Sequence, residues 1–513
     1  MKNERYIYDA LYGKIYLDPI IWEIFSMPEL QRLREVRLCN INSLCLTGGA
    51  NINRFEHAIG TLYLAQCCIE KIPLVTKREK RNFLFAALLH DAANAAFGHS
   101  LEYILAQDDY NPEKGFKDAL QGKNKKESFT YKNHAHEVYY FGLQRKLGTI
   151  INDDDFEEVA KIVRGEGKFG ALISGSIDLD NIDNIYRLSY HLGLIGKTDT
   201  PIKLAESMWT ESEELVVNNL VKPLIEEWYK VRKNLYLLLL ENPEEFSAKC
   251  MLTEAVELAR IESLENKEAI FSWNQTDMEI LTALKNVSIR ELSFDIEKTV
   301  NYELNTKERL ETYIKEKYKR YEQDKENKEK WLAYFKNQYI YYELLNDKTQ
   351  ITISIKKQFN PPLIIEKLVT GRLFPCISIF STVNTDFYKN LIDFNKKTII
   401  ETKINLELKN LEIAEKFNLQ IVLHPILDIN KTERQISVKN NLGEYINVGN
   451  STKRLLIGVF IRNEKFDITN FNYDKFKIDE VNEKIKELLV FLVQDKELIE
   501  IELYNEINKL EII

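Results

Sequence analysis

The spacing of apolar residues predicts that the first half of the chain is helical. Residues 56–71, EHAIGTLYLAQCCIEK, and residues 81–97, RNFLFAALLHDAANAAF, repeat apolar side chains at helical intervals, so we predict a helix over each segment. A helical pattern returns over residues 204–263. Residues 107–130 are polar with scattered glycines, which predicts an irregular insertion and a candidate lid.

The last third of the chain has a different pattern of apolar residues. TQITISI alternates with a period of two, LLIGVFI is typical of a buried strand, and the segment beginning VNEKIKELLVFLV returns to an amphipathic helical pattern. Upstream, oppositely charged residues such as Glu311 and Lys315 lie one helical turn apart. We therefore predict a mainly α fold with a C-terminal α+β lobe. Its parts are a helical core over residues 1–265, a helical, charged connector over 266–346 and an α+β domain over 347–513.

Length and charge narrow the class of protein. At about 100 to 200 residues per domain, 513 residues predict two to four folded units. The apolar fraction of 44% excludes a disordered chain. The formal net charge of −9 argues against bulk binding of nucleic acid or of anionic lipid, although a local basic pocket could still hold phosphates.

We expect a cytoplasmic protein. Its apolar runs are far shorter than the roughly 20 residues that cross a bilayer, and the start of the chain, MKNERYIYDALYG, does not look like a secretory signal. Six cysteines occur without a CxxC pair, which favours reduced thiols over a zinc ribbon or a disulfide framework.

Histidine and carboxylate positions indicate a metal site. Six of the seven histidines lie within residues 57–191. His90 and Asp91 follow directly after an apolar helical run, His57 lies upstream in NRFEHAIG, and Asp180 lies downstream in SGSIDLDNID. Two imidazoles and two carboxylates suit a divalent ion such as Mn, Mg or Fe, with one ion or two ions sharing a carboxylate. A histidine that merely caps a helix end explains His90 alone, but not the four together.

The order of these residues resembles that of the HD-domain superfamily, and the sequence motifs around them resemble those of its deoxynucleoside triphosphate triphosphohydrolases. The resemblance covers about residues 7–240 through YGKIYLDPIIWEIF, PELQRLREVR, NRFEHAIGTLYLA, LLHDAANAAFGHS and IDLDNIDNIYR. It implies that residues 1–265 are an HD-domain catalytic core that cleaves a dNTP at its α-phosphorus, releasing deoxynucleoside and tripolyphosphate. Homo-oligomers with nucleotide effectors between subunits are implied as well.

The resemblance also assigns roles to further residues. His99 and Glu102, three residues apart on a predicted helix, are the expected general acid and its orienting carboxylate. Arg54 and Arg232 are expected to contact phosphate, and His136 in NHAHE is expected near the phosphates as a further catalytic residue.

Several expected substrate-binding positions depart from the family pattern. Asn94 stands where many members have a second histidine, Asn181 where a lysine is common, and Asn184 in place of a tyrosine that faces the sugar. Leu188 replaces an aspartate, and Cys39 with Asn40 occupies the region that reads the 3′-hydroxyl and the base. The metal ligands are therefore intact while the sugar-reading residues are not, which leaves the choice of nucleotide open.

Two other functions fit the same residues. One is an HD phosphatase or phosphodiesterase that acts on a monophosphate, a modified nucleotide or a cyclic nucleotide. The other is a metal- and nucleotide-binding sensor without turnover, which would have no need for His99 and Glu102 beside four ligands. Defence against phage is one of several biological settings that the sequence leaves open.

Overall fold

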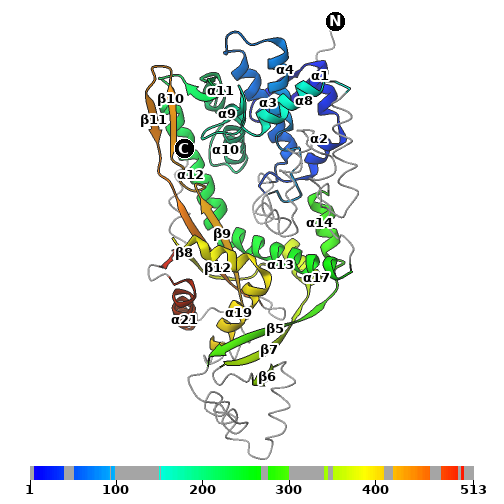
Figure 1. Ribbon diagram of the computed structural model, residues 1–513, viewed down its shortest axis with the longest axis vertical. Helices are drawn as coiled ribbons and strands as arrows, with labels where there is room; N and C mark the ends of the chain where they lie inside the picture. Colours follow the sequence, from blue (N-terminus) through cyan, green and yellow to red (C-terminus); the bar gives the residue numbers. More distant parts are fainter. Residues whose placement is uncertain are drawn as a thin grey trace, which may run out of the picture.

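The computed structural model describes most of the two predicted lobes (Figure 1). The described residues are 5–39, 51–92, 94–98, 149–150, 152–266, 275–299, 340–344, 350–408, 420–462, 475–494 and 498–501.

The first lobe is a helical core around one central helix, α3 (Arg54–Ile69). Helices α4 (Lys77–Leu89), α10 (Leu179–His191) and α11 (Thr200–Glu206) pack directly against it, and Ala58, Leu62 and Ala65 of α3 are buried among them. The remaining elements of this lobe are β1 (Arg5–Asp9), β2 (Gly13–Leu17), α1 (Pro19–Phe25), α2 (Pro28–Arg32), η1 (Leu33–Glu35), α8 (Asp153–Val163), α9 (Gly170–Ile173) and α12 (Lys222–Glu241).

Side-chain caps fix where the three helices of the site begin. The Asn53 side chain accepts a hydrogen bond from the amide of Glu56 at 2.9 Å, so α3 starts three residues before His57. Asp178 accepts from the amide of Asn181 at 2.7 Å and starts α10 just before Asp180. Thr76 begins α4 with a capping box, and His90 is the residue that ends it.

The helix predicted over residues 81–97 is correct only as far as Leu89. The chain turns after His90, and Phe97 adopts a left-handed conformation with φ of 56°. The apolar spacing continues past the turn because Ala95, Ala96 and Phe97 are also buried, so periodicity alone does not reveal the end of the helix.

The segment over residues 204–263 is not helical throughout. Residues Met208–Glu211 and Glu214–Val217 form the hairpin β3–β4, and Ser212 and Glu213 take positive φ values of 50° and 69° in its turn. Two-residue turns of this kind usually contain glycine or asparagine, so the sequence gives no turn signal here. Helices α12 and α13 (Pro243–Asn266) occupy the rest of the segment, as predicted.

The second lobe is built on a four-stranded sheet of order β13-β8-β12-β9. The sheet consists of β8 (Cys376–Thr382), β9 (Gln420–Ile429), β12 (Lys453–Arg462) and β13 (Ile499–Glu500). Helices α13, α19 (Phe394–Leu408) and α21 (Lys475–Val493) pack against it, and α17 (Pro361–Val369) packs on α13 (Figure 1). The strand predicted at LLIGVFI is confirmed as part of β12, and that at TQITISI as part of β7 (Gln350–Phe359).

A smaller sheet of order β5-β7-β6 changes the prediction for the connector. Strand β5 (Arg290–Thr299) and strand β6 (Ile340–Leu344) both lie within residues 266–346, which we expected to be helical, and both pair with β7. Within this range α14 (Asp277–Leu284) is helical, and residues 300–339 lie outside the described residues. The charged run behind the helical prediction, KERLETYIKEKYKRYEQDKENKEKW, lies outside the described residues, whereas RELSFDIEKT alternates apolar and polar residues and forms a strand.

The two lobes share one sheet. Strand β10 (Ile436–Asn440) pairs in parallel with β4 through Lys439 and Asn440, and β11 (Tyr445–Val448) extends it, giving the order β11-β10-β4-β3. The loop between β9 and β10 is thereby held against the helical core. Among the described residues, no helix is both long enough and apolar enough to cross a bilayer.

Candidate metal centre

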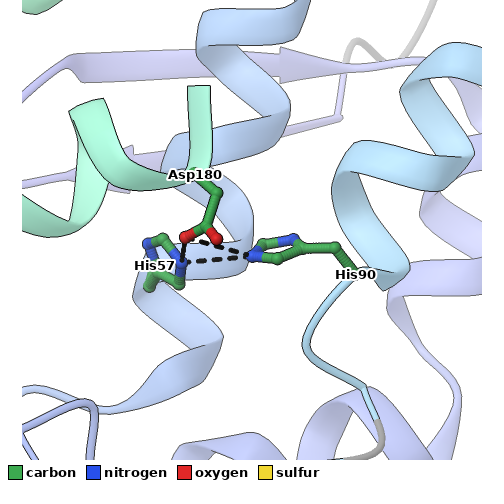
Figure 2. A group of neighbouring side chains, drawn as sticks. All are labelled: His57, His90 and Asp180. Atoms are coloured by element: carbon green, nitrogen blue, oxygen red, sulfur yellow. Dashed lines mark hydrogen bonds and ion pairs between the residues drawn. The ribbon is translucent and has the colours of Figure 1, made fainter. Parts of the chain in front are cut away.

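Three side chains from three helices converge on one point (Figure 2). His57 comes from the first turn of α3, His90 from the end of α4 and Asp180 from the first turn of α10. The Nε2 atom of His57 lies 3.2 Å from Nε2 of His90 and 3.0 Å from Oδ1 of Asp180, and His90 Nε2 lies 3.6 Å from the same oxygen. Ligands at right angles and about 2.1 Å from one cation lie about 3 Å apart, so this donor set fits a divalent ion.

Hydrogen bonds orient both imidazole rings toward that point. The Nδ1 atom of His57 lies 2.8 Å from Oδ2 of Asp183, and Nδ1 of His90 lies 2.8 Å from the carbonyl oxygen of Ala87. Each acceptor favours a proton on Nδ1, which leaves the lone pair of each Nε2 facing the other ring and Asp180. Two lone pairs that face each other inside a protein are the arrangement expected of a metal site.

Asp91, the fourth predicted ligand, borders the cluster. Its Oδ2 atom lies 3.7 Å from Nε2 of His57 and 3.9 Å from Nε2 of His90. The same oxygen pairs with Nη1 of Arg54 at 2.6 Å, and the Asn94 side chain donates to the other carboxylate oxygen at 2.5 Å. Arg54 and Asn94, which we expected to bind substrate, thus contact this carboxylate.

The four groups form a strongly coupled set of charges. Burial opposes protonation of His57, but its hydrogen bonds to Asp180 and Asp183 outweigh burial and raise the pKa of His57 to about 10, so Nε2 keeps a proton until a bound cation displaces it and takes the lone pair. Burial alone would raise the pKa of Asp180, whereas His90 and His57 lower it well below its usual range. The Asp180 side chain is 33% exposed and that of His57 1%, so the carboxylate marks the open side of the site.

Two aspartates that we did not predict support the ligands. Asp183 is buried beneath His57, and Asp178 caps α10 while accepting hydrogen bonds from the amide and side chain of Asn181. Asn181 stands where a lysine is common in the family, and it hydrogen-bonds to Asp178, the N-cap residue of α10. The spacing of Asp180 and Asp183 by three residues on one helix face is a signal that could have revealed the second aspartate.

The remaining expected substrate-binding residues occupy different surroundings. Arg232 is buried, and its guanidinium donates to the carbonyl oxygens of Asn430 and Lys431 in the loop between β9 and β10. Cys39 is buried, and burial raises the pKa of its thiol. Asn184 is half-buried on α10. The expected catalytic residues His99, Glu102 and His136 lie outside the described residues, as do Asn40 and the candidate lid.

Comparisons with known proteins agree with this geometry. Residues 54–187 match the family model of the HD domain. The chain is 30% identical over 258 residues to an uncharacterized protein of Methanocaldococcus jannaschii, covering 49% of each chain. It is 24% identical over 278 residues to an uncharacterized protein of Bacillus subtilis, covering 53% of this chain and 59% of that one. The chain thus spans about half the length of these two relatives.

A shorter match names an activity. Over 104 residues the chain is 33% identical to the deoxynucleoside triphosphate triphosphohydrolase SAMHD1 of Homo sapiens, covering 19% of this chain and 16% of that protein. A solved structure, a phosphohydrolase of Bacteroides thetaiotaomicron, has the same fold with a TM-score of 0.52 at 17% identity, covering 90% of this chain and 100% of the other. The residues matched to the HD domain include His57, His90 and Asp180 of the cluster, so over residues 54–187 the chain is similar to the HD domain, and its partial relatives include deoxynucleoside triphosphate triphosphohydrolases.

Proposed function

We propose that this protein hydrolyses a nucleotide phosphate ester with the help of a divalent metal ion. The observation that carries the proposal is the convergence of His57, His90 and Asp180, with both Nδ1 atoms engaged and both Nε2 atoms facing inward. A bound divalent ion would lower the pKa of a water molecule and would neutralise negative charge on the phosphate. His57, His90 and Asp180 would hold it, and Asp91 would complete the set once released from Arg54.

A group of basic side chains, which includes Arg232 and Arg434, supports a phosphate substrate. Arg232 stacks on Tyr236, whose pKa is raised by burial and by the negative charge of Asp180, and Arg434 donates to the carbonyl oxygen of Gly175 at 2.8 Å. Burial, reinforced by Arg434, lowers the pKa of Arg232. Like charges that are gathered and desolvated in this way favour an anion between them.

Lys249 is a further basic side chain beside this group. Burial, together with the charge of Lys431, lowers the pKa of Lys249 to about 7, so a bound anion would favour its charged form at neutral pH. Because Lys431 and Arg434 belong to the loop between β9 and β10, the second lobe would contribute directly to the phosphate pocket. Arg232 would then act both on phosphate and as the anchor of this loop.

The finer proposal is a dNTP triphosphohydrolase. Attack at the α-phosphorus would release deoxynucleoside and tripolyphosphate, with His99 protonating the leaving 5′-oxygen, Glu102 orienting His99, and His136 near the phosphates. Cys39 and Asn184 would face the nucleoside. Support comes from the partial match to human SAMHD1, and a homo-oligomer with nucleotide effectors belongs to the same proposal.

A product analysis tests the proposal. Purified full-length protein is stripped of metal with a chelator, reloaded with Mn²⁺, Mg²⁺ or Fe²⁺, and offered each dNTP, each NTP, monophosphates and cyclic nucleotides. We expect deoxynucleoside and tripolyphosphate from at least one dNTP, and no products from the stripped protein. The matched control is the same protein reloaded after stripping, which must recover the starting rate.

The products separate the alternatives. Orthophosphate from a monophosphate, or a linear nucleotide from a cyclic one, would keep the metal hydrolase and replace the dNTP as its substrate. Binding of nucleotide without any turnover, under each metal and with each nucleotide added as an effector, would contradict the proposal and favour a sensor.

A further inference from the structure

A chain of buried hydrogen bonds runs from His57 to the first hairpin of the protein. Oδ2 of Asp183, the oxygen that holds Nδ1 of His57, also accepts from Nε of Arg187 at 2.9 Å, and Oδ1 of Asp183 accepts from Nη2 of Arg187 at 3.0 Å. The remaining arm of the guanidinium, Nη1, donates to Oδ2 of Asp9 at 2.7 Å. Each carboxylate in this chain is bound by charge-assisted hydrogen bonds.

Asp9 is itself fixed by the turn of the hairpin β1–β2. Its Oδ1 atom accepts from the backbone amides of Leu11 at 2.9 Å and Tyr12 at 2.8 Å, which leaves Oδ2 for Arg187. The Tyr12 ring lies below the same guanidinium, 5.5 Å from its carbon. The position of Asp9 is therefore set by a local turn that lies 178 residues away in sequence from the arginine that it holds.

This series of hydrogen bonds passes close to the backbone of α3 at a glycine, Gly60. A β-carbon at Gly60, one turn after His57 on α3, would lie 2.0 Å from Oδ1 of Asp183 and 2.2 Å from Nη2 of Arg187. The side chains of Asp183 and Arg187 are 0% exposed, and that of Asp9 is 3% exposed. A buried pair in such close contact with a helix backbone has no freedom to reorient, so its geometry is passed on to His57.

We propose that Asp9 and Arg187 are positioning residues of the metal centre, so that the hairpin β1–β2 is a functional part of the site. Arg187 holds Asp183 as an ionised carboxylate in one orientation, and Asp9 holds Arg187. Asp183 in turn fixes the proton of His57 on Nδ1 and keeps Nε2 available to the cation. The proposal rests on the metal centre of the proposed function.

The test measures Mn²⁺ affinity of the full chain directly, by calorimetry or by the electron paramagnetic resonance of free Mn²⁺, so it does not need turnover. Loss of an outer partner of a metal-bound histidine weakens metal affinity by about 10 to 100-fold, and we expect this for Asp183→Asn and Arg187→Met. Asp9→Asn should give a smaller loss. Arg187→Lys should recover part of the affinity, because the charge returns without the two-pronged contact.

A double variant separates positioning from general stability. If Asp9 acts through Arg187, the Asp9→Asn and Arg187→Met losses in Mn²⁺ affinity are not additive, and the double variant binds no more weakly than Arg187→Met alone. Affinities are compared only for protein whose circular dichroism and thermal unfolding show a folded chain. Wild-type affinity in folded Asp9→Asn and Arg187→Met would overturn the inference while leaving the proposed function intact. Absence of Mn²⁺ binding by the wild type would overturn both.

A glycine variant covers the case in which Arg187→Met does not fold. Alanine is normally a better helix former than glycine, so Gly60→Ala should stabilise an ordinary helix. Here it pushes on Asp183 and Arg187, and we expect weaker Mn²⁺ binding. Gly196→Ala is the matched control, because its added β-carbon meets nothing within 4 Å and should leave affinity unchanged. Equal affinity in both glycine variants would count against the proposal.

Discussion

The two lobes of this protein both bury paired charges, but the helical core also turns two histidines toward each other. In the second lobe Arg462 meets Glu254 at 2.5 Å and Arg454 contacts Asp428 at 2.9 Å, and Arg454 also reaches Glu241 at the end of α12 at 2.5 Å. The helical core has such pairs as well, including Arg187 with Asp183, but there His57 and His90 present two ring nitrogens to each other at 3.2 Å. Paired charges neutralise each other, whereas two imidazole nitrogens that face each other need a cation between them.

This difference separates structural from functional burial of charge. A buried ion pair whose partners are both present needs nothing further and stabilises one arrangement of the chain. A cluster of donors with no complementary group at its centre is stable only because its outer atoms are held, as Asp183 and Ala87 hold the two rings. The comparison predicts that variants in the core change metal binding, and that variants in the second lobe change stability.

The largest expected effect is in the core. Asp180→Ala and His90→Ala should each abolish nucleotide hydrolysis and Mn²⁺ binding, because each removes one of the three converging donors. Turnover and Mn²⁺ binding are measured on the same preparations. Asp199→Ala is the matched control: this carboxylate is 66% exposed and pairs with Lys203 on the surface, so both properties should stay at the wild-type level. Undiminished hydrolysis in Asp180→Ala would refute the ligand assignment.

The convergence of three of the predicted ligands could be anticipated because their positions are marked locally. His57, His90 and Asp180 each sit at a helix end that the sequence marks with a cap or with the close of an apolar run, and the chain has only seven histidines. The role of Arg232 could not be predicted in the same way. Its partners are the carbonyl oxygens of residues about 200 positions later, which no local pattern reveals.

The fold was predictable to a similar depth. Alternation identified β7, and a continuous apolar run identified β12, which is buried along most of its length. The prediction missed β5, although Leu292, Phe294 and Ile296 alternate with polar residues there. It also missed the turn at Ser212 and Glu213, where the pairing of β3 with β4 holds two exposed residues in a conformation that they rarely choose. Apolar patterns in the sequence thus predicted which residues are buried. They predicted helices and strands only where burial of one face determines the backbone conformation.

The second effect concerns stability in the second lobe. Arg462→Met removes one partner of a pair in which both side chains are at most 2% exposed, and a broken buried pair costs about 3 to 5 kcal/mol. We expect that loss in chemical denaturation, with Mn²⁺ affinity unchanged in the folded protein. Replacing both partners, Arg462→Met with Glu254→Leu, should recover much of the loss because no lone charge remains. A change in Mn²⁺ affinity as large as the change in stability would break the division between the lobes.

A third effect, which appears as a change of stability with pH, sharpens the comparison at a group that fits neither pattern. Glu245 at the start of α13 is 1% exposed, and both of its carboxylate oxygens are buried without a hydrogen-bond partner. Burial, reinforced by the neighbouring Glu244, raises the pKa of Glu245 to about 8, so in the folded protein the group is a neutral acid at mildly acidic pH.

The sign of the pH effect follows from linkage. Because the pKa of Glu245 is higher in the folded than in the unfolded chain, the folded state binds more protons between about pH 4.5 and about pH 8, and its stability falls as pH rises through that window. Glu245→Gln keeps the shape and removes the titration. Chemical denaturation should therefore show the variant gaining on the wild type from acidic to mildly alkaline pH. A difference that stays constant with pH would mean that Glu245 is charged in the folded protein and has a partner, as the other buried charges of its lobe do.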